Sequence, residues 1–276
     1  MIHLRSITQK GFGEKDEFPF NVPVIRALDE IVFHAPVAFF VGENGSGKST
    51  LMETIACAAG SVTVGSESVK TDPSLAHVRK LAQHLRLSWT KRTHRGFFLR
   101  AEDFFGYAKQ MAQTRQELED DLRKVDGEYK GRSELAKELA KLPHANELHA
   151  IKSRYGDGLD ARSHGESFLS LFQSRFVPNG LYLLDEPEAP LSPIRQLAFL
   201  SALKQMATED SQFIIATHSP ILLAFPGATV LSLDGGKLSP VDYAETEHFR
   251  VTRDFLNAPE RFFRHLFAEG DGRSSA

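Results

Sequence analysis

Cysteine and tryptophan each occur once in this 276-residue sequence, and no apolar run is long enough to span a lipid bilayer. The single cysteine, Cys57, excludes an internal disulfide framework and is typical of a reducing compartment. Neither a signal peptide nor a spanning segment is evident, which favours a cytoplasmic protein without direct membrane insertion. The net charge of −3 excludes a uniformly basic protein but leaves room for a local basic patch.

Phenylalanine is plentiful, with 21 residues, and predicts a large aromatic core. Hydrophobic residues make up 41% of the chain and charged residues 25%, proportions typical of a globular domain. The length is at the upper end for a single core. We therefore expect one domain over residues 1–276.

A phosphate-binding loop is the most informative motif. Residues 42–49 fit G-x-x-x-x-G-K-[ST], with an apolar run at 37–41 before them and a helical pattern at 50–56 after them. Strand, glycine-rich loop and helix is the context that this motif requires. Backbone N–H groups of the loop and the helix start would surround the phosphates of ATP. The predicted nucleotide-binding residues of the loop are Gly42, Glu43, Asn44, Gly45, Ser46, Gly47, Lys48, Ser49 and Thr50.

Lysine, serine and two carboxylates predict the hydrolysis chemistry. Lys48 would reach the β- and γ-phosphates, and the Ser49 hydroxyl would bind Mg²⁺. The apolar run 181–184 ends in Asp185 and Glu186, and ligands collect at the carboxyl ends of such strands. Asp185 would hold Mg²⁺, directly or through water, while Glu186 would orient and polarise the attacking water. The alternative is that both carboxylates only cap a helix or face solvent.

A histidine follows the next apolar run, 213–216, within the sequence Thr-His-Ser-Pro. Continuous apolar runs of this kind belong in the middle of a parallel sheet that is covered on both faces. If this strand neighbours strand 181–184, His218 lies near the γ-phosphate. The alternative is a structural histidine at a strand end.

The rest of the pattern predicts strands at 2–7, 84–90, 96–100 and 229–233, and a helix at 193–208. Residues 102–142 read as a helical hairpin of about forty residues. One of its faces carries Leu118, Leu122, Val125 and Tyr129, and a second apolar stripe carries Leu135, Leu139 and Leu142. A last helix at 259–267 is expected to cap the core through Phe262, Phe263, Leu266 and Phe267.

The order of these motifs resembles the ABC-type ATPase family. Residues 163–167, Ser-His-Gly-Glu-Ser, open a helix 22 residues before Asp185, where that family has its serine-glycine-glycine signature. The resemblance implies an α/β P-loop NTPase fold with a central, mostly parallel sheet, an N-terminal β element and an inserted helical subdomain. It assigns residues 1–101 and 176–276 to the nucleotide-binding core and 102–175 to the helical subdomain, which ends in the signature.

The resemblance also implies a homodimer that forms on ATP binding. Ser163 and the Gly165 amide would contact the γ-phosphate bound by the opposite subunit, and residues 189–192 would form a dimer contact. His164 departs from the signature glycine. The family's glutamine is not evident, and Glu102 is its best substitute, as a candidate metal ligand. Phe12, Phe18 and Phe20 are candidates for the aromatic side chain that stacks on adenine.

The implied activity is hydrolysis of ATP with water to ADP and phosphate. The motifs look most like compact SMC/RecF-like bacterial ATPases, which suggests a switch in DNA maintenance, repair or defence, with an effector left unidentified. Residues 79–100 hold many cations and no acidic residue, as expected of a surface for double-stranded DNA. The alternative for residues 79–100 is an ordinary solvated hairpin. The alternative function for the whole chain is that of an ATP-binding subunit that energises a membrane transporter.

Overall fold

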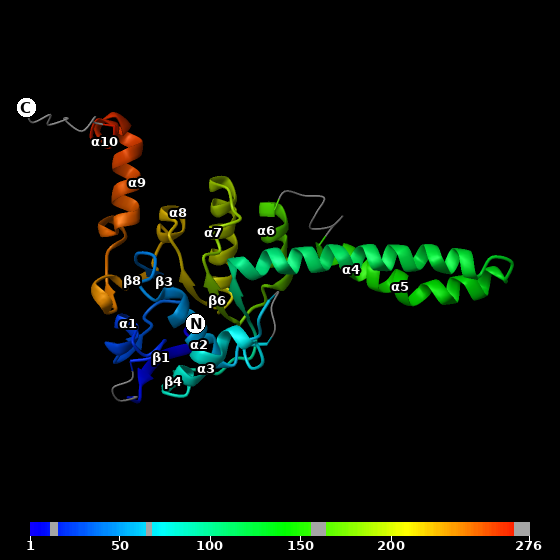
Figure 1. Ribbon diagram of the computed structural model, residues 1–276, viewed down its shortest axis with the longest axis horizontal. Helices are drawn as coiled ribbons and strands as arrows, with labels where there is room; N and C mark the ends of the chain where they lie inside the picture. The colour runs from blue at the N-terminus through cyan, green and yellow to red at the C-terminus, as the bar shows by residue number, and fades with distance from the viewer. Residues whose placement is uncertain (12–15, 65–67, 156–163, 268–276) are drawn as a thin grey trace, which may run out of the picture.

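The computed structural model describes residues 1–11, 16–64, 68–155 and 164–267. A six-stranded sheet with the order β5-β6-β7-β3-β8-β9 forms its centre (Figure 1). Its neighbouring strands are parallel except for β8 and β9. The mostly parallel sheet of a P-loop NTPase is thereby confirmed. The strands are β3 (Val37–Val41), β5 (Phe98–Arg100), β6 (Leu181–Asp185), β7 (Gln212–Ala216), β8 (Thr229–Ser232) and β9 (Ser239–Pro240).

A second, antiparallel sheet forms the expected N-terminal β element. Its order is β2 (Glu30–Val32), β1 (Leu4–Gln9) and β4 (Leu85–Trp89). The alternating pattern at 84–90 therefore predicted a strand correctly, and this strand pairs with the N-terminal one across some eighty residues of sequence.

The core lies on both faces of the central sheet because successive side chains of a strand point to opposite sides. In β3, Ala38 and Phe40 belong to one buried cluster, while Phe39 and its odd-numbered neighbours belong to the other. The second cluster contains most of the buried aromatic rings, including Phe172 and Phe199, whose ring centroids lie 4.7 Å apart. Most of the buried phenylalanines thus lie on one face of the central sheet.

Helices cover the two faces of this sheet (Figure 1). The face shared with the N-terminal sheet carries α1 (Pro23–Arg26), α2 (Lys48–Ala59), η1 (Pro73–Leu75) and α3 (Ala76–Ala82). The aromatic face carries α6 (His164–Arg175), α7 (Pro193–Thr208) and α8 (Pro220–Leu223). The expected helix at 193–208 is confirmed with its predicted bounds.

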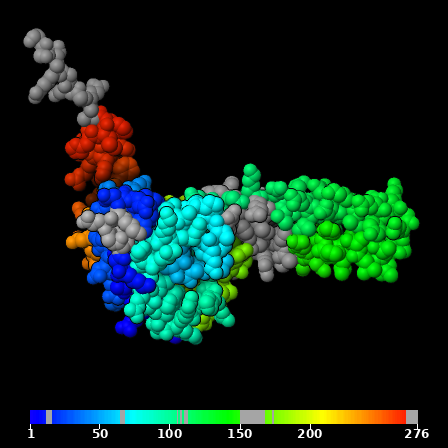
Figure 2. Space-filling model, turned by 60° about the horizontal axis from the view of Figure 1, so that its bottom comes forward, coloured from blue at the N-terminus to red at the C-terminus, as the bar shows by residue number. Residues whose placement is uncertain are grey.

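A helical hairpin of α4 (Ala101–Glu128) and α5 (Glu134–Tyr155) projects from the body (Figures 1 and 2). It is longer than expected, because α5 continues through Pro143. Leu118 and Leu148 are buried. The predicted stripe of Leu135, Leu139 and Leu142 lies at the surface, with each side chain more than half exposed.

The chain ends in a second projection, the C-terminal arm, made of α9 (Glu247–Asn257) and α10 (Pro259–Leu266), after the short turns η2 (Asp234–Gly236) and η3 (Tyr243–Glu245). The expectation that α10 caps the core is wrong. This helix packs on α9 and stands away from the sheet (Figure 1). Its Leu266 and the following Phe267 are 68% and 73% exposed. No helix in the described ranges is both long and apolar enough to cross a bilayer.

Candidate functional site

The phosphate-binding loop joins β3 to α2 at the carboxyl edge of the sheet. Gly47 ends the loop with a left-handed φ of 99°, and a Cβ there would lie 2.7 Å from the side chain of Val22. Glycine is therefore required on both counts. The ammonium of the buried Lys48 donates to the backbone oxygens of Gly42, at 2.7 Å, and Glu43, at 2.9 Å. Lys48 thus lies folded over the loop where phosphate is expected.

Ser49 and Asp185 lie together and have the chemistry of a Mg²⁺ site. Asp185 ends β6 and is 6% exposed. Burial raises the pKa of Asp185 to about 7, although a hydrogen bond with the Ser49 side chain opposes this rise. Asp185 Oδ1 is buried and has no hydrogen-bond partner among the described residues. A divalent cation would compensate this buried carboxylate, so the residues present fit Mg²⁺.

Glu186 follows Asp185 in an unusual conformation. Its φ is 51°, in a region that costs a non-glycine residue on the order of 1–3 kcal/mol. Its backbone N–H donates to the Ala216 oxygen of β7 at 2.9 Å, which fixes the backbone at the edge of the sheet. The carboxylate stays 45% exposed and faces His218, whose Nε2 lies 3.5 Å from Glu186 Oε1.

His218 is held by two further contacts. Its backbone N–H donates to Glu188 Oε1 at 2.6 Å, and its Nδ1 lies 2.9 Å from His248 Nε2. Burial lowers the pKa of His218, and Lys48 and His248 lower it further. Its Nε2 is buried with no hydrogen-bond partner in the described part of the chain. As expected, β6 and β7 are neighbours, and His218 lies beside Glu186.

A cleft of about 310 Å³ opens beside these groups. Glu102, at the start of α4, lies on its wall with a 75% exposed side chain, 3.5 Å from Arg100. The structure therefore brings this weakest of the predicted ligands to the same cleft as Ser49 and Asp185. The cleft is lined by Ser49, Glu53, Arg100, Ala101, Glu102, Asp185 and Glu186.

Three charged or titratable neighbours of the site were absent from the sequence prediction: Glu53, Asp234 and His248. Asp234 Oδ1 accepts a hydrogen bond from the Glu43 N–H of the loop at 3.0 Å. Its position just after β8, the strand beside β3, is a signal that could have found it. Glu53 lies on α2 one turn after Ser49, and this spacing could have found it. His248 belongs to no sequence motif, so no signal in the sequence indicates it.

Two predicted features cannot be placed in this site. Ser163 lies outside the described residues, and Gly165 falls in the first turn of α6. Of the aromatic candidates for adenine, Phe12 also lies outside the described residues, Phe20 is buried, and Phe18 is 51% exposed and contacts the ring of His77. Of the two described candidates, Phe18 is therefore the better exposed for stacking.

The basic window is smaller than its sequence indicates. Arg100 does not belong to this exposed surface, because its side chain is only 12% exposed and is ion-paired with Glu53, Asp72 and Asp103. Arg79 donates to backbone oxygens of residues 69 and 72. The cations of the window that remain exposed are Lys80, Arg86, Lys91, Arg92 and Arg95.

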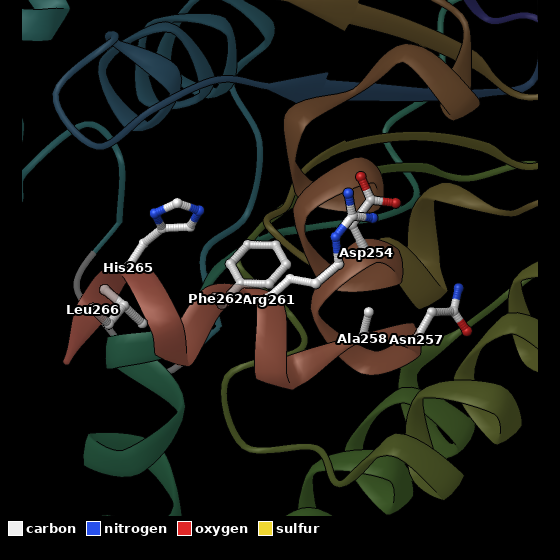
Figure 3. A pocket seen from close by; sticks show the side chains of 7 residues that line it. All are labelled: Asp254, Asn257, Ala258, Arg261, Phe262, His265 and Leu266. Carbon is white, nitrogen blue, oxygen red and sulfur yellow. The ribbon is translucent and has the colours of Figure 1, made fainter. Parts of the chain in front are cut away.

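A larger pocket, of about 510 Å³, lies on the C-terminal arm (Figure 3). Asp254 and Asn257 of α9 and Arg261, Phe262 and His265 of α10 line it (Figure 3). None of the residues predicted for nucleotide binding is among its lining. Chemistry, not volume, therefore locates the candidate site at the phosphate-binding loop.

Comparisons with known proteins show which proteins this chain is similar to. A model of the AAA domain family matches residues 21–205. The L-cystine transport system ATP-binding protein TcyN of Escherichia coli (strain K12) is 26% identical over 269 residues, which cover 92% of this chain and 96% of TcyN. The macrolide export ATP-binding/permease protein MacB of Pectobacterium atrosepticum is 25% identical over 86% of this chain, which spans 34% of MacB. Among solved structures, the Smc head domain from Pyrococcus furiosus, bound to the C-terminal domain of ScpA, has a TM-score of 0.45 and 12% identity, covering 94% of this chain and 100% of that chain.

Proposed function

Because this chain belongs to the AAA domain family, we propose that it hydrolyses ATP to ADP and phosphate and acts as a switch that dimerises around ATP. The resemblance to ABC-type ATPases is confirmed by this family and by relatives that are named ATP-binding proteins.

One observation carries the proposal. The phosphate-binding loop, the Asp185–Glu186 pair and His218 come from three neighbouring strands, β3, β6 and β7, and meet at one edge of the sheet. Ligands of open α/β sheets bind at this edge. An ATPase assay with Mg²⁺ tests the proposal directly, and purified protein that turns over no ATP would contradict it.

Each residue has a stated task in this mechanism. Lys48 leaves the two backbone oxygens of the loop and binds the β- and γ-phosphates. Ser49 and Asp185 would hold Mg²⁺, which neutralises phosphate charge when bound. Glu186 accepts a hydrogen bond from the attacking water and orients it toward the γ-phosphate. His218 donates from Nε2, the nitrogen that lacks a partner among the described residues, to a γ-phosphate oxygen.

A second copy of the chain completes the enclosure in this proposal. Ser163 and the Gly165 amide of one subunit contact the γ-phosphate bound by the other, and residues 189–192 pack between them. Hydrolysis removes the phosphate that joins the two copies, so the dimer opens.

Lys48→Ala is expected to weaken ATP binding about 10- to 100-fold, because charge-assisted hydrogen bonds to phosphate contribute about 1.5–3 kcal/mol. Isothermal titration calorimetry with ATP and Mg²⁺ measures the effect. Lys204→Ala, on the exposed side of α7, is the matched control and keeps wild-type affinity. Unchanged affinity in Lys48→Ala would refute the loop assignment.

We further propose a cytoplasmic role in DNA maintenance, repair or defence, of the SMC/RecF-like kind, with double-stranded DNA as a partner and an effector still to be identified. The supporting observation is the exposed cation set on β4 and the segment that follows it. Lys91, Arg92 and Arg95 are exposed there, and Arg95 donates to the Pro178 backbone oxygen at 3.3 Å. Such a surface contacts phosphates without reading sequence.

Charge reversal of Arg92 and Arg95 to Glu is expected to weaken binding to duplex DNA and to reduce the slope of log affinity against log salt by about 2, since each phosphate contact contributes about 0.9. Fluorescence anisotropy over a salt series measures both quantities. Reversal of the exposed Lys130 and Lys204 changes the net charge equally and is the control. If the wild-type protein binds no DNA at low salt, this role is excluded.

The alternative role is to energise a membrane transporter. It is favoured by TcyN, whose name describes an ATP-binding protein of a transport system and whose length this chain matches almost completely. ATPase rates with and without duplex DNA separate the two roles. Stimulation by DNA favours the first, while recovery of a permease in a pull-down and a rate insensitive to DNA favour the second.

A further inference from the structure

A side chain of the C-terminal arm, that of His248, contacts His218 of the candidate hydrolysis site. His248 lies in the first turn of α9, and its Nε2 is 2.9 Å from His218 Nδ1. The two ring centroids are 5.0 Å apart with the planes tilted by 56°, so the rings meet at their edges through these nitrogens. No motif of the sequence assigns His248 a role.

The 2.9 Å contact links the tautomers of the two rings, because one nitrogen must donate and the other must accept. If His248 Nε2 is the donor, His218 Nδ1 has the lone pair and the hydrogen of the neutral His218 ring lies on Nε2. His218 Nε2 lies 3.5 Å from Glu186 Oε1 and makes no hydrogen bond with a described residue, so it stays available as a donor.

This tautomer of His218 is the one that hydrolysis needs. Nε2–H can donate to an anionic phosphate oxygen, whereas an Nε2 lone pair would repel it. A donor at Nδ1 thus stabilises the useful tautomer and fixes the plane of the ring. A hydrogen bond to the second nitrogen sets the tautomer of functional histidines in general.

The position of His248 is itself well supported. The buried Thr246 caps α9, since its Oγ1 accepts from the Phe249 N–H and donates to the Tyr243 oxygen at 2.7 Å. The Tyr243 and Phe249 rings are 4.5 Å apart and line one groove with residues of α8, the helix that begins two residues after His218. Because α8 and α9 contact each other, the segment that carries His218 lies beside the first turn of α9.

We propose that His248 is a positioning residue that holds His218 as the Nε2–H tautomer, aimed at the γ-phosphate, and so makes the C-terminal arm part of the ATPase site. The inference rests on the proposed function for its kinetic consequence only. The protonation pattern of His218 is a property of the nucleotide-free protein.

The test compares His248→Leu, which has no donor, with His248→Gln, whose side-chain amide keeps a donor near the Nε2 position. His248→Leu is expected to lower kcat about three- to tenfold, the range for one neutral hydrogen bond. KM changes by less than about twofold, because Lys48 and Ser49 still bind the phosphates. His248→Gln restores most of the rate, and His265→Leu on α10 leaves it unchanged.

Long-range ¹H–¹⁵N NMR of the nucleotide-free protein supplies the second readout. His218 is expected as the Nε2–H tautomer in the wild type and as a tautomer mixture in His248→Leu. An unchanged His218 tautomer in His248→Leu, or an equal loss of kcat in both variants, overturns the inference while the ATPase proposal stands. Absence of ATPase activity in the wild type defeats the proposed function, and the NMR comparison still decides the role of His248.

Discussion

Glu186→Gln is expected to slow ATP hydrolysis by about 10²-fold or more while ATP still binds, because a positioned carboxylate contributes on this scale. The amide keeps the size of the side chain and removes its charge and most of its basicity. Lys48, Ser49 and the loop backbone are untouched, so affinity for ATP is retained. Steady-state phosphate release gives the rate, and calorimetry gives the affinity.

The same variant is expected to accumulate as a dimer. If ATP joins two copies and hydrolysis separates them, a protein that binds ATP without cleaving it stays closed. Analytical ultracentrifugation with ATP and Mg²⁺ then shows a dimer for Glu186→Gln, and a monomer with ADP. Glu260→Gln, an exposed carboxylate on the arm, serves as control for the charge change. If Glu186→Gln sediments entirely as a monomer in the presence of ATP, the proposal that two subunits enclose ATP is disproved.

The sequence could predict which residues meet at the centre of the candidate site because its parts are local in the chain. A phosphate-binding loop needs strand, glycines and helix in a row, and carboxylates at the end of an apolar strand are visible without a structure. The continuous apolar runs predicted a sheet covered on both faces, and the expected neighbours, 181–184 and 213–216, do pair as β6 and β7. Glu102 was predicted only from its position in the chain, as the substitute for the family's glutamine, and it does line the cleft.

What the sequence did not predict depends on contacts between distant segments. His248 lies 30 residues after His218, in a helix whose pattern shows only amphipathicity. The helix at 259–267 was expected on the core because an apolar face normally packs on one, yet α10 packs on α9 and its Leu266 and Phe267 are exposed. The absence of acidic residues within 79–100 suggested a free basic surface, but folding brings acidic residues from elsewhere to Arg100.

Arg100→Met is expected to lower the free energy of unfolding by about 3–5 kcal/mol, because removing one partner of a buried ionic group leaves the others uncompensated. Arg100 is 12% exposed, lies 3.1 Å from Glu53 Oε1, and binds both oxygens of Asp103, at 2.8 and 3.0 Å. Burial alone would lower the pKa of Arg100, but the hydrogen bonds and charges of Asp103 and Glu53 raise it. Urea denaturation measures the loss, and Arg92→Met, exposed in the same window, stays within about 0.5 kcal/mol of wild type.

The dependence of this loss on pH identifies its cause. Burial raises the pKa of Glu53 even in the wild type, and the hydrogen bond from Arg100 opposes the rise. Without Arg100 the folded-state pKa of Glu53 rises further above its unfolded value, so the folded protein binds more protons and loses stability as pH increases. The loss in free energy of unfolding caused by Arg100→Met is therefore expected to be smaller near pH 5 than near pH 8.

A double-mutant cycle gives the sharpest form of this prediction. Glu53→Gln destabilises the wild type, since it removes the partner of a buried guanidinium, but stabilises Arg100→Met, since it removes a buried charge that has lost its partner. A change of sign between the two backgrounds is expected only if the residues form one ionic cluster inside the protein. If Glu53→Gln changes the free energy of unfolding equally in both backgrounds, Arg100 is not part of an ionic cluster. It would then count again among the solvated cations that are candidates for contacting DNA.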